Sequence, residues 1–243
     1  MSRRASQWVA STLLATLLIE PALAAKDECV IVLHGLARTS SSMNTMASAL
    51  EDAGYTVFNI DYPSREHTIE ALAPMVIAEG LSLCEAADAT QRTHFVAHSM
   101  GGILVRQYVA ENTIDNIGRM VMLGPPNQGS VAADKLRGMP GFDWLNGPAG
   151  YQLGKGEDSV PLKLGPPGFE VGVIAGTRSI DPISSAVLPD PDDGKVSVAD
   201  TKLEGMTDHI VVAHSHALMM RLAGPIKLTI RFLKTGSFSV TPE

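Results

Sequence analysis

The stretch THFVAHSMGGILVRQYV, residues 93–109, indicates the fold of this chain. It begins with the apolar run 94–97, which is typical of a strand in the middle of a parallel sheet. From Ile103 onward, apolar residues recur with helical rather than alternating spacing. Ser99 lies at the junction and is followed by Met-Gly-Gly. The sequence therefore predicts a sharp strand–turn–helix with a serine in its turn.

The residues that flank Ser99 are as small as such a turn requires. The residues two before and two after the central one approach each other closely, and here they are Ala97 and Gly101. The central residue is held in a strained conformation that lifts its side chain above the carboxyl end of the sheet. The usual pattern is G-x-S-x-G, and Ala97 departs from it by one methyl group. We therefore predict that Ser99 is a nucleophile.

Outward from this stretch, predicted strands and helices alternate along the chain. Ser40–Ser42 is expected to cap a helix that Gly54 ends, and 67–84 is mostly helical, with Pro74 in a first turn or at a kink. A closing helical region is expected to be interrupted at Gly224-Pro225. The predicted strands are residues 29–33, 55–60, 94–97, 119–123, 170–175 and 209–213. This alternation predicts an α/β fold, with a mostly parallel central sheet and helices on both faces.

The alternation breaks after residue 123, where Gly-Pro-Pro follows the fourth predicted strand. The segment 127–168 is rich in glycine and proline and contains the apolar residues Phe142, Trp144 and Leu145. We interpret it as a lid-like insertion in a single domain rather than as a second domain. It is expected to cover the site and to set the preference for the apolar part of a substrate.

Residues 1–24 have the order of a secretory signal. Two arginines precede the apolar stretch Trp8–Ile19, and small residues lead to Ala24. The apolar stretch is too short to span a bilayer comfortably, so a retained anchor is the weaker interpretation. We expect cleavage after Ala24, a mature domain of residues 25–243 without an integral membrane segment, and a periplasmic or secreted location.

The net charge limits the classes of binding partner, and the two cysteines indicate a disulfide. The 243 residues are 45% hydrophobic and carry a formal net charge of −7 without a basic run, which argues against nucleic acid or an anionic membrane as the main partner. Both cysteines, Cys29 and Cys84, lie in the predicted exported part. We predict that they form a disulfide, with two buried free thiols as the alternative.

His34-Gly35-Leu36 directly follows the first predicted strand. A tetrahedral oxyanion needs two preorganised N–H donors, one usually from the residue after the nucleophile and one from this loop. Those donors would be the backbone N–H groups of Met100 and Leu36, and His34 would shape the loop. The alternative is a simple His-Gly turn without this function.

A serine nucleophile needs a base, and the base needs an orienting acid. Both are expected at strand ends that follow Ser99 in the chain. His216 immediately precedes the closing helix and is favoured as the base over His214. Asp193 is favoured as the acid, with Asp192 and Asp181 as its competitors. A zinc site at the two histidines would lack an obvious third ligand, so no metal is predicted.

Four motifs stand in this order along the chain: His34-Gly35-Leu36, Ala97-His98-Ser99-Met100-Gly101-Gly102, Asp193-Gly194-x-Val196 and Ser215-His216. In this combination the chain resembles a bacterial α/β-hydrolase of the lipase/esterase group. The resemblance implies a Ser–Asp–His triad that cleaves a small acyl ester or lipid through an acyl-enzyme, without a cofactor. A thioesterase, an acyltransferase or a non-catalytic lipid-binding relative are the alternatives. Some lipases of this group bind calcium, but the aspartates near residue 192 do not complete an EF-hand spacing.

Overall fold

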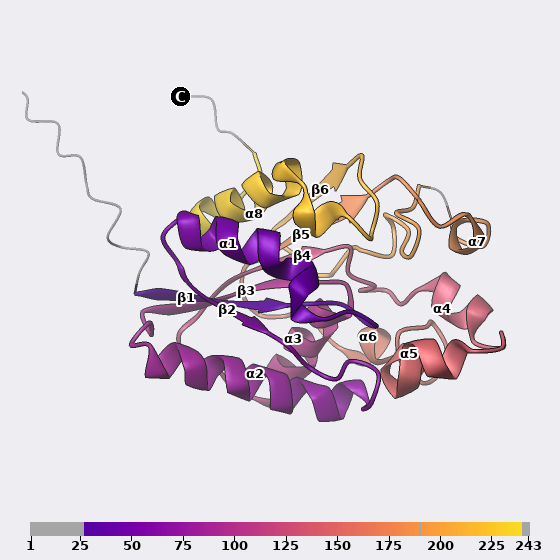
Figure 1. Cartoon of the computed structure of the whole chain (residues 1–243), viewed down its shortest axis with the longest axis horizontal. Coiled ribbons are helices and arrows are strands. Elements are labelled where there is room, and N and C mark those ends of the chain that lie inside the picture. Colours follow the sequence, from indigo (N-terminus) through magenta and orange to yellow (C-terminus); the bar gives the residue numbers. More distant parts are fainter. Residues whose placement is uncertain (1–26, 190, 240–243) are drawn as a thin grey trace, which may run out of the picture.

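The computed structural model describes residues 27–189 and 191–239, and its centre is a six-stranded parallel sheet (Figure 1). The strand order is β2-β1-β3-β4-β5-β6, and every neighbouring pair is parallel. The strands are β1 (Glu28–Leu33), β2 (Thr56–Ile60), β3 (Arg92–His98), β4 (Ile117–Leu123), β5 (Val171–Gly176) and β6 (Asp208–Val212). The predicted α/β fold is confirmed, and each predicted strand begins and ends within two residues of its observed bounds.

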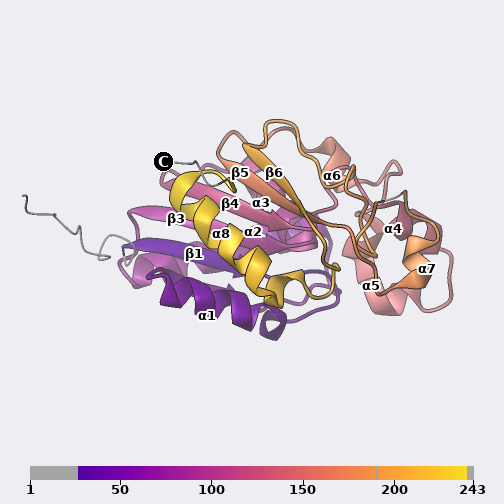
Figure 2. The ribbon, with the colours of Figure 1, turned by 90° about the horizontal axis from the view of Figure 1, so that it is seen from above.

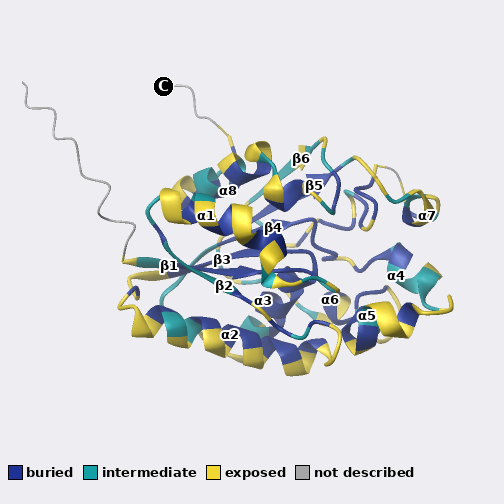
Figure 3. Cartoon of the chain, viewed as in Figure 1, coloured by how far each residue is buried: buried dark blue, intermediate teal, exposed yellow. Residues whose placement is uncertain are grey.

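Helices cover both faces of the sheet (Figures 1 and 2). Helices α2 (Ile69–Ala86) and α3 (Met100–Glu111) pack on one face, and α1 (Asn44–Asp52) and α8 (Ala223–Thr235) pack on the other. Alternate residues of β1 face the two layers. Ile31 and Leu33 belong to the hydrophobic cluster on the α2–α3 side, and their neighbours Val30 and Val32 belong to the cluster on the α1–α8 side. Figure 3 shows the result, with buried strands between helices whose outer surfaces are exposed.

Two helix starts differ from the predictions. Ser40–Met43 forms a 3-10 turn ahead of α1, and the residue before α1 makes no side-chain cap, so the predicted serine cap is wrong. Instead the Ser42 hydroxyl donates to a backbone carbonyl within the turn. Gly224 and Pro225 stand in the first turn of α8 and do not interrupt it. A proline is tolerated there because the first N–H groups of a helix have no partner within the helix. Pro74 lies inside α2, beyond its first turn.

The predicted disulfide is present between β1 and α2. Cys29, in β1, and Cys84, near the end of α2, are bonded, with their Cα atoms 5.8 Å apart. Both side chains are buried in the core. The bond therefore fixes the last turns of the longest helix against the sheet that it covers.

The chain leaves the sheet between β4 and β5, where the insertion was predicted. Helices α4 (Val131–Leu136), α5 (Phe142–Tyr151) and α6 (Val160–Lys163) lie in this segment. Together with α7 (Pro182–Ser185), α4 and α5 lie beyond the carboxyl ends of the strands (Figure 1). A 3-10 turn, η3 (Met219–Arg221), precedes α8.

The predicted signal, residues 1–24, lies outside the described residues. Within the described ranges, no helix combines the length and the apolar character that crossing a membrane requires.

Candidate functional site

Ser99 occupies a strained turn between β3 and α3. Its φ is 52° and its ψ is −122°, which is a rare conformation for a residue with a side chain. The Ser99 N–H donates to the Leu123 carbonyl (2.9 Å), and its own carbonyl accepts from the N–H of Gly102 (3.1 Å). The surrounding backbone thus holds the conformation, and the serine stands above the carboxyl end of the central strands.

The loop after β1 passes close to this turn, which explains why the turn contains small residues. A Cβ added to Gly101 would lie 2.7 Å from the His34 carbonyl oxygen. A Cβ added to Gly35 would lie 3.1 Å from the Cβ of Ser99. Ala97 is fully buried and fits with its methyl group in place. The departure from G-x-S-x-G therefore leaves the geometry of the turn intact.

His34 shapes the loop after β1. Its ring stacks on Tyr62, with ring centroids 3.9 Å apart and planes 11° apart. The Tyr62 hydroxyl donates to the His34 carbonyl (2.5 Å), and the Tyr62 N–H lies 3.3 Å from the His34 Nε2. Burial lowers the pKa of His34, so the ring is neutral at pH 7. The histidine is fully buried and does not line the cavity described below.

Two backbone N–H groups near Ser99 are free to donate. Among the described residues, neither the Leu36 N–H nor the Met100 N–H makes a hydrogen bond to the protein. Met100 is the first residue of α3, where N–H groups have no partner in the helix and the helix dipole is positive. These are the two donors that the sequence analysis predicts for an oxyanion.

Asp193 and His216 form a buried hydrogen-bonded pair. The His216 Nδ1 and the Asp193 Oδ2 are 2.8 Å apart, and the His216 N–H donates to the Asp193 carbonyl (2.9 Å). The other carboxylate oxygen accepts from the N–H groups of Lys195 (3.0 Å) and Val196 (2.8 Å). These hydrogen bonds hold both oxygens of the Asp193 carboxylate. Asp193 is 1% exposed, so the carboxylate is also shielded from water. Asp193 bonds to His216 and not to His214.

Gly124 lies directly behind this pair and was not among the residues predicted for the site. It has φ +58°, and a Cβ there would lie 2.9 Å from both the Asp193 Oδ2 and the His216 Nδ1. Only glycine suits both the conformation and the space. Its position immediately after a predicted buried strand was the available signal.

His98, the residue before the serine, supports His216 from the other side. Its Nε2 donates to the His216 carbonyl (2.9 Å), and the two rings lie 4.6 Å apart. Burial lowers the pKa of His98 well below its usual value, and positive charge on His216 or Arg38 would lower it further. His98 is therefore a neutral donor that fixes the backbone of His216.

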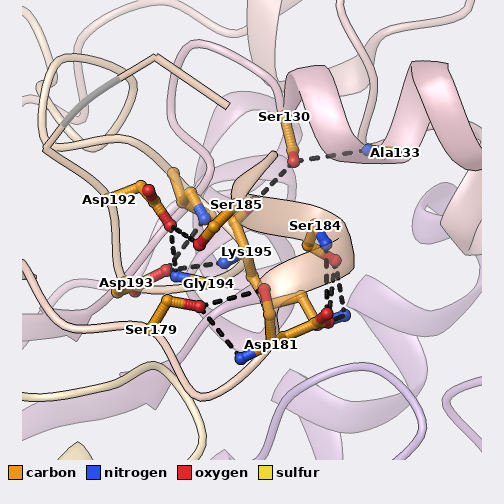
Figure 4. A network of polar contacts seen from close by, with 11 residues as sticks. Ser130, Ala133, Ser179, Asp181, Ser184, Ser185, Asp192, Asp193, Gly194 and Lys195 are labelled. Carbon is orange, nitrogen blue, oxygen red and sulfur yellow. Dashed lines mark hydrogen bonds and ion pairs between the residues drawn. The ribbon is translucent and has the colours of Figure 1, made fainter. Parts of the chain in front are cut away.

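The two alternatives to Asp193 have structural roles in the neighbouring loop (Figure 4). One Asp192 oxygen accepts from the Gly194 N–H (2.7 Å) and closes a tight turn. Asp181 accepts from Ser184 at the start of α7 and from the Lys195 ammonium (2.7 Å). Burial acts to raise the pKa of Asp181, but Lys195 and Ser184 outweigh it and hold the pKa at about 2. In the described part of the chain, no three potential ligands are grouped to hold a metal ion.

A cavity of about 570 Å³ lies over these groups. Ser99, His216 and Leu36 line it, and most of its remaining lining comes from residues 130–153 of the insertion. Both Ser99 and His216 reach this cavity, and within the described residues no hydrogen bond joins the Ser99 hydroxyl to the imidazole. Such bonds are often loose before substrate binds.

The apolar residues of the insertion face two different cavities. Phe142 and Leu145 line the cavity above Ser99, as the sequence analysis expects. Trp144 does not line it; its side chain is 79% exposed and borders a second cavity of about 590 Å³. Of the three apolar residues in the insertion that was expected to cover the site, Trp144 therefore does not face it, because successive residues of a helix point in different directions.

Comparisons with known proteins agree with this fold. A family model described as the alpha/beta hydrolase fold matches residues 28–151. Similar solved structures include the mature lipase BlEst2 of Bacillus licheniformis, with 18% identity, a TM-score of 0.62, and coverage of 87% of this chain and 92% of that one. Phospholipase PlaB of Legionella pneumophila has 18% identity and a TM-score of 0.67, and the match covers 86% of this chain and 59% of that one. The RedJ thioesterase of Streptomyces coelicolor has 15% identity and a TM-score of 0.54, and the match covers 95% of this chain and 100% of that one. These identities show a shared fold, and no curated protein matches the chain.

Proposed function

The chain belongs to the α/β-hydrolase fold family, and on that premise we propose that it is an exported serine hydrolase of carboxylic esters, of the lipase/esterase type. The observation that carries the proposal is the buried Asp193–His216 hydrogen bond, whose imidazole opens onto the same cavity as Ser99. A nucleophile, a base and an orienting acid are the three parts that acyl transfer through serine requires.

In the proposed reaction, the Ser99 oxygen attacks the carbonyl carbon of the ester, and His216 takes the hydroxyl proton. Asp193 holds the Nδ1–H of the imidazole and stabilises the imidazolium that forms. The tetrahedral intermediate collapses, the C–O bond to the alcohol breaks, and His216 returns the proton to the leaving oxygen. Water then attacks the acyl-enzyme with His216 again as the base, which releases the acid and restores Ser99.

The oxyanion of each tetrahedral intermediate is assigned to the N–H groups of Leu36 and Met100. Within the described residues neither N–H group has a protein partner, which supports this role, because a donor already engaged would have to break a hydrogen bond during the reaction. The positive end of the α3 dipole adds to the stabilisation. Loss of one such donor typically costs about 10²- to 10³-fold in turnover.

Export is proposed from two features of the chain. Residues 1–24 have the order of a secretory signal, and the Cys29–Cys84 disulfide is a bond that forms and persists in oxidising compartments. The proposal therefore places the mature enzyme in the periplasm or outside the cell.

A panel of acyl donors tests the proposal. The purified protein is assayed on p-nitrophenyl esters from acetate to palmitate, on matched acyl thioesters, and with added alcohols as alternative acceptors. We expect faster cleavage of esters than of thioesters, with free acid as the main product. Preferred cleavage of thioesters, or transfer of the acyl group to the added alcohol in place of water, would replace the ester hydrolase by one of these related activities. Cleavage of no acyl donor would refute the proposal.

A further inference from the structure

Arg38 is a cation beside the proposed nucleophile, and it has no partner among the described residues. It follows Leu36 by two residues, and it lines both the cavity above Ser99 and the second cavity. The residue is half-buried, and among the described residues its guanidinium makes no hydrogen bond and no ion pair. Burial lowers the pKa of Arg38, and the positive charge of Arg221 lowers it further, yet a guanidinium stays charged in proteins.

A second arginine faces the same space. Arg65 also lines the second cavity, and its guanidinium lies 5.9 Å from the centre of the Trp144 ring. The part of the chain that the structure describes offers it no carboxylate within ion-pair distance. Arg65 is exposed, so a ligand in the second cavity can reach it.

Two carboxylates, Asp61 and Glu66, also line the second cavity, and among the described residues neither forms an ion pair with these arginines. Asp61 accepts from the Ser40 N–H (2.6 Å) and lies 3.7 Å from the His34 Nε2, and within the described residues it makes no ion pair with Arg38 or Arg65. Glu66 lies outside ion-pair distance of Arg38 and Arg65.

The two cavities differ in chemical character. The first cavity combines Ser99 with apolar side chains of the insertion, which suits an acyl chain. The second cavity is lined mainly by polar and charged residues and meets the first at Arg38. A partly desolvated guanidinium without a counter-ion is costly for a protein to keep, and its planar fork matches phosphate and carboxylate groups.

We infer that Arg38 and Arg65 form a subsite for a phosphate group on the alcohol side of the scissile ester, so that the preferred substrates are acylated glycerol phosphates. This inference rests on the proposed function. The acyl chain occupies the cavity under α4 and α5, the ester carbonyl meets Ser99, and the phosphate accepts hydrogen bonds from Arg38. No step of the hydrolysis changes, since the phosphate binds without reacting.

A matched pair of soluble substrates tests the subsite. 1-Butyrylglycerol and 1-butyrylglycerol 3-phosphate differ only in the phosphate, and release of butyrate is measured for both. We expect a higher kcat/KM for the phosphate ester. Arg38→Gln should lower kcat/KM for the phosphate ester about 10- to 100-fold more than for the neutral ester, the range for a hydrogen bond to a charged group. Arg38→Lys should restore part of the preference.

Two further variants provide a second test of the subsite and a matched control. Arg65→Gln changes an exposed residue, so it tests the subsite even if Arg38→Gln fails to fold. Arg92→Gln removes the same charge at the amino end of β3, far from the cavities, and should change neither rate. Equal losses on both substrates for Arg38→Gln and Arg65→Gln, or no loss on either, would overturn the inference while the esterase proposal stands. Absence of butyrate release from both substrates by the unaltered protein would instead refute the proposed function.

Inorganic phosphate distinguishes a substrate subsite from a site for free phosphate. If the phosphate of the substrate binds at Arg38, added inorganic phosphate should inhibit hydrolysis of the phosphate ester competitively, and Arg38→Gln should weaken that inhibition. Activation of 1-butyrylglycerol hydrolysis by inorganic phosphate, lost in Arg38→Gln, would mean that the arginines bind a free effector and would overturn the substrate assignment.

Discussion

Breaking the Cys29–Cys84 disulfide should lower the melting temperature substantially. The bond closes a loop with a sequence separation of 55 residues, and the loop-entropy relation gives about 4 kcal/mol of stability at this length. For a domain of this size, 1 kcal/mol corresponds to about 2–4 °C, so we expect a decrease of about 8–16 °C. The stabilisation acts through the unfolded chain, whose freedom the bond restricts.

Thermal unfolding followed by circular dichroism measures this effect. The oxidised protein is compared with the reduced protein and with Cys29→Ala/Cys84→Ala, which cannot form the bond. The reduced protein keeps both sulfur atoms, so any further decrease in the melting temperature of the double variant measures the cost of the cavities that the alanines leave. Addition of reductant should not shift the double variant. A decrease below about 2 °C in both reduced protein and double variant would refute the reasoning, and two reactive thiols in the denatured oxidised protein would show that the bond is absent.

Three further predictions concern the site and its surroundings. Gly124→Ala should lower kcat by more than about tenfold, because the added Cβ meets the hydrogen-bonded pair and strains a positive φ; unchanged kinetics would show that the pair needs no such space. Leu145→Ser should slow hydrolysis of long-chain esters more than of acetate esters, whereas Trp144→Ser should affect both alike; a chain-length series that ranks them in reverse contradicts the cavity assignment. Stability should fall as the pH drops below 6.5, because the unfolded chain then protonates histidines that stay neutral when buried. His98→Gln should make this loss shallower, by up to about 1.4 kcal/mol per pH unit in denaturant titrations, and an unchanged slope would contradict a neutral buried His98.

The sheet could be predicted from the sequence because its signals are local. Each buried strand of a parallel sheet is a short continuous apolar run, and each is bounded by glycine, proline or polar residues. The turn at Ser99 was also visible from its small flanking residues, Ala97 and Gly101, and the approach of the loop after β1 leaves no room for a side chain at Gly101. These signals extend over a few residues and do not depend on the rest of the fold.

Features that depend on contacts between distant segments leave weaker signals in the sequence. His214 and His216 are two residues apart, so strand alternation does not distinguish them. The sequence favours His216 only by its place before the closing helix, and in the structure the Asp193 carboxylate bonds to that histidine. The need for a glycine at position 124 arises only because its loop meets the loops that carry Asp193 and His216. Arg38 carries no local signal, because the sequence does not show that two cavities meet there.

The central claim is that Ser99 is the activated nucleophile, and covalent labelling tests it most directly. The protein is treated with a fluorophosphonate, digested, and mapped by mass spectrometry while residual ester hydrolysis is followed. We expect one label, on Ser99, with loss of activity in proportion to labelling. Labelling should be absent in Ser99→Ala and strongly slowed in His216→Ala, while the melting temperature of Ser99→Ala stays close to that of the unaltered protein. Stoichiometric label on another residue, or full hydrolytic activity in purified Ser99→Ala, would contradict the account.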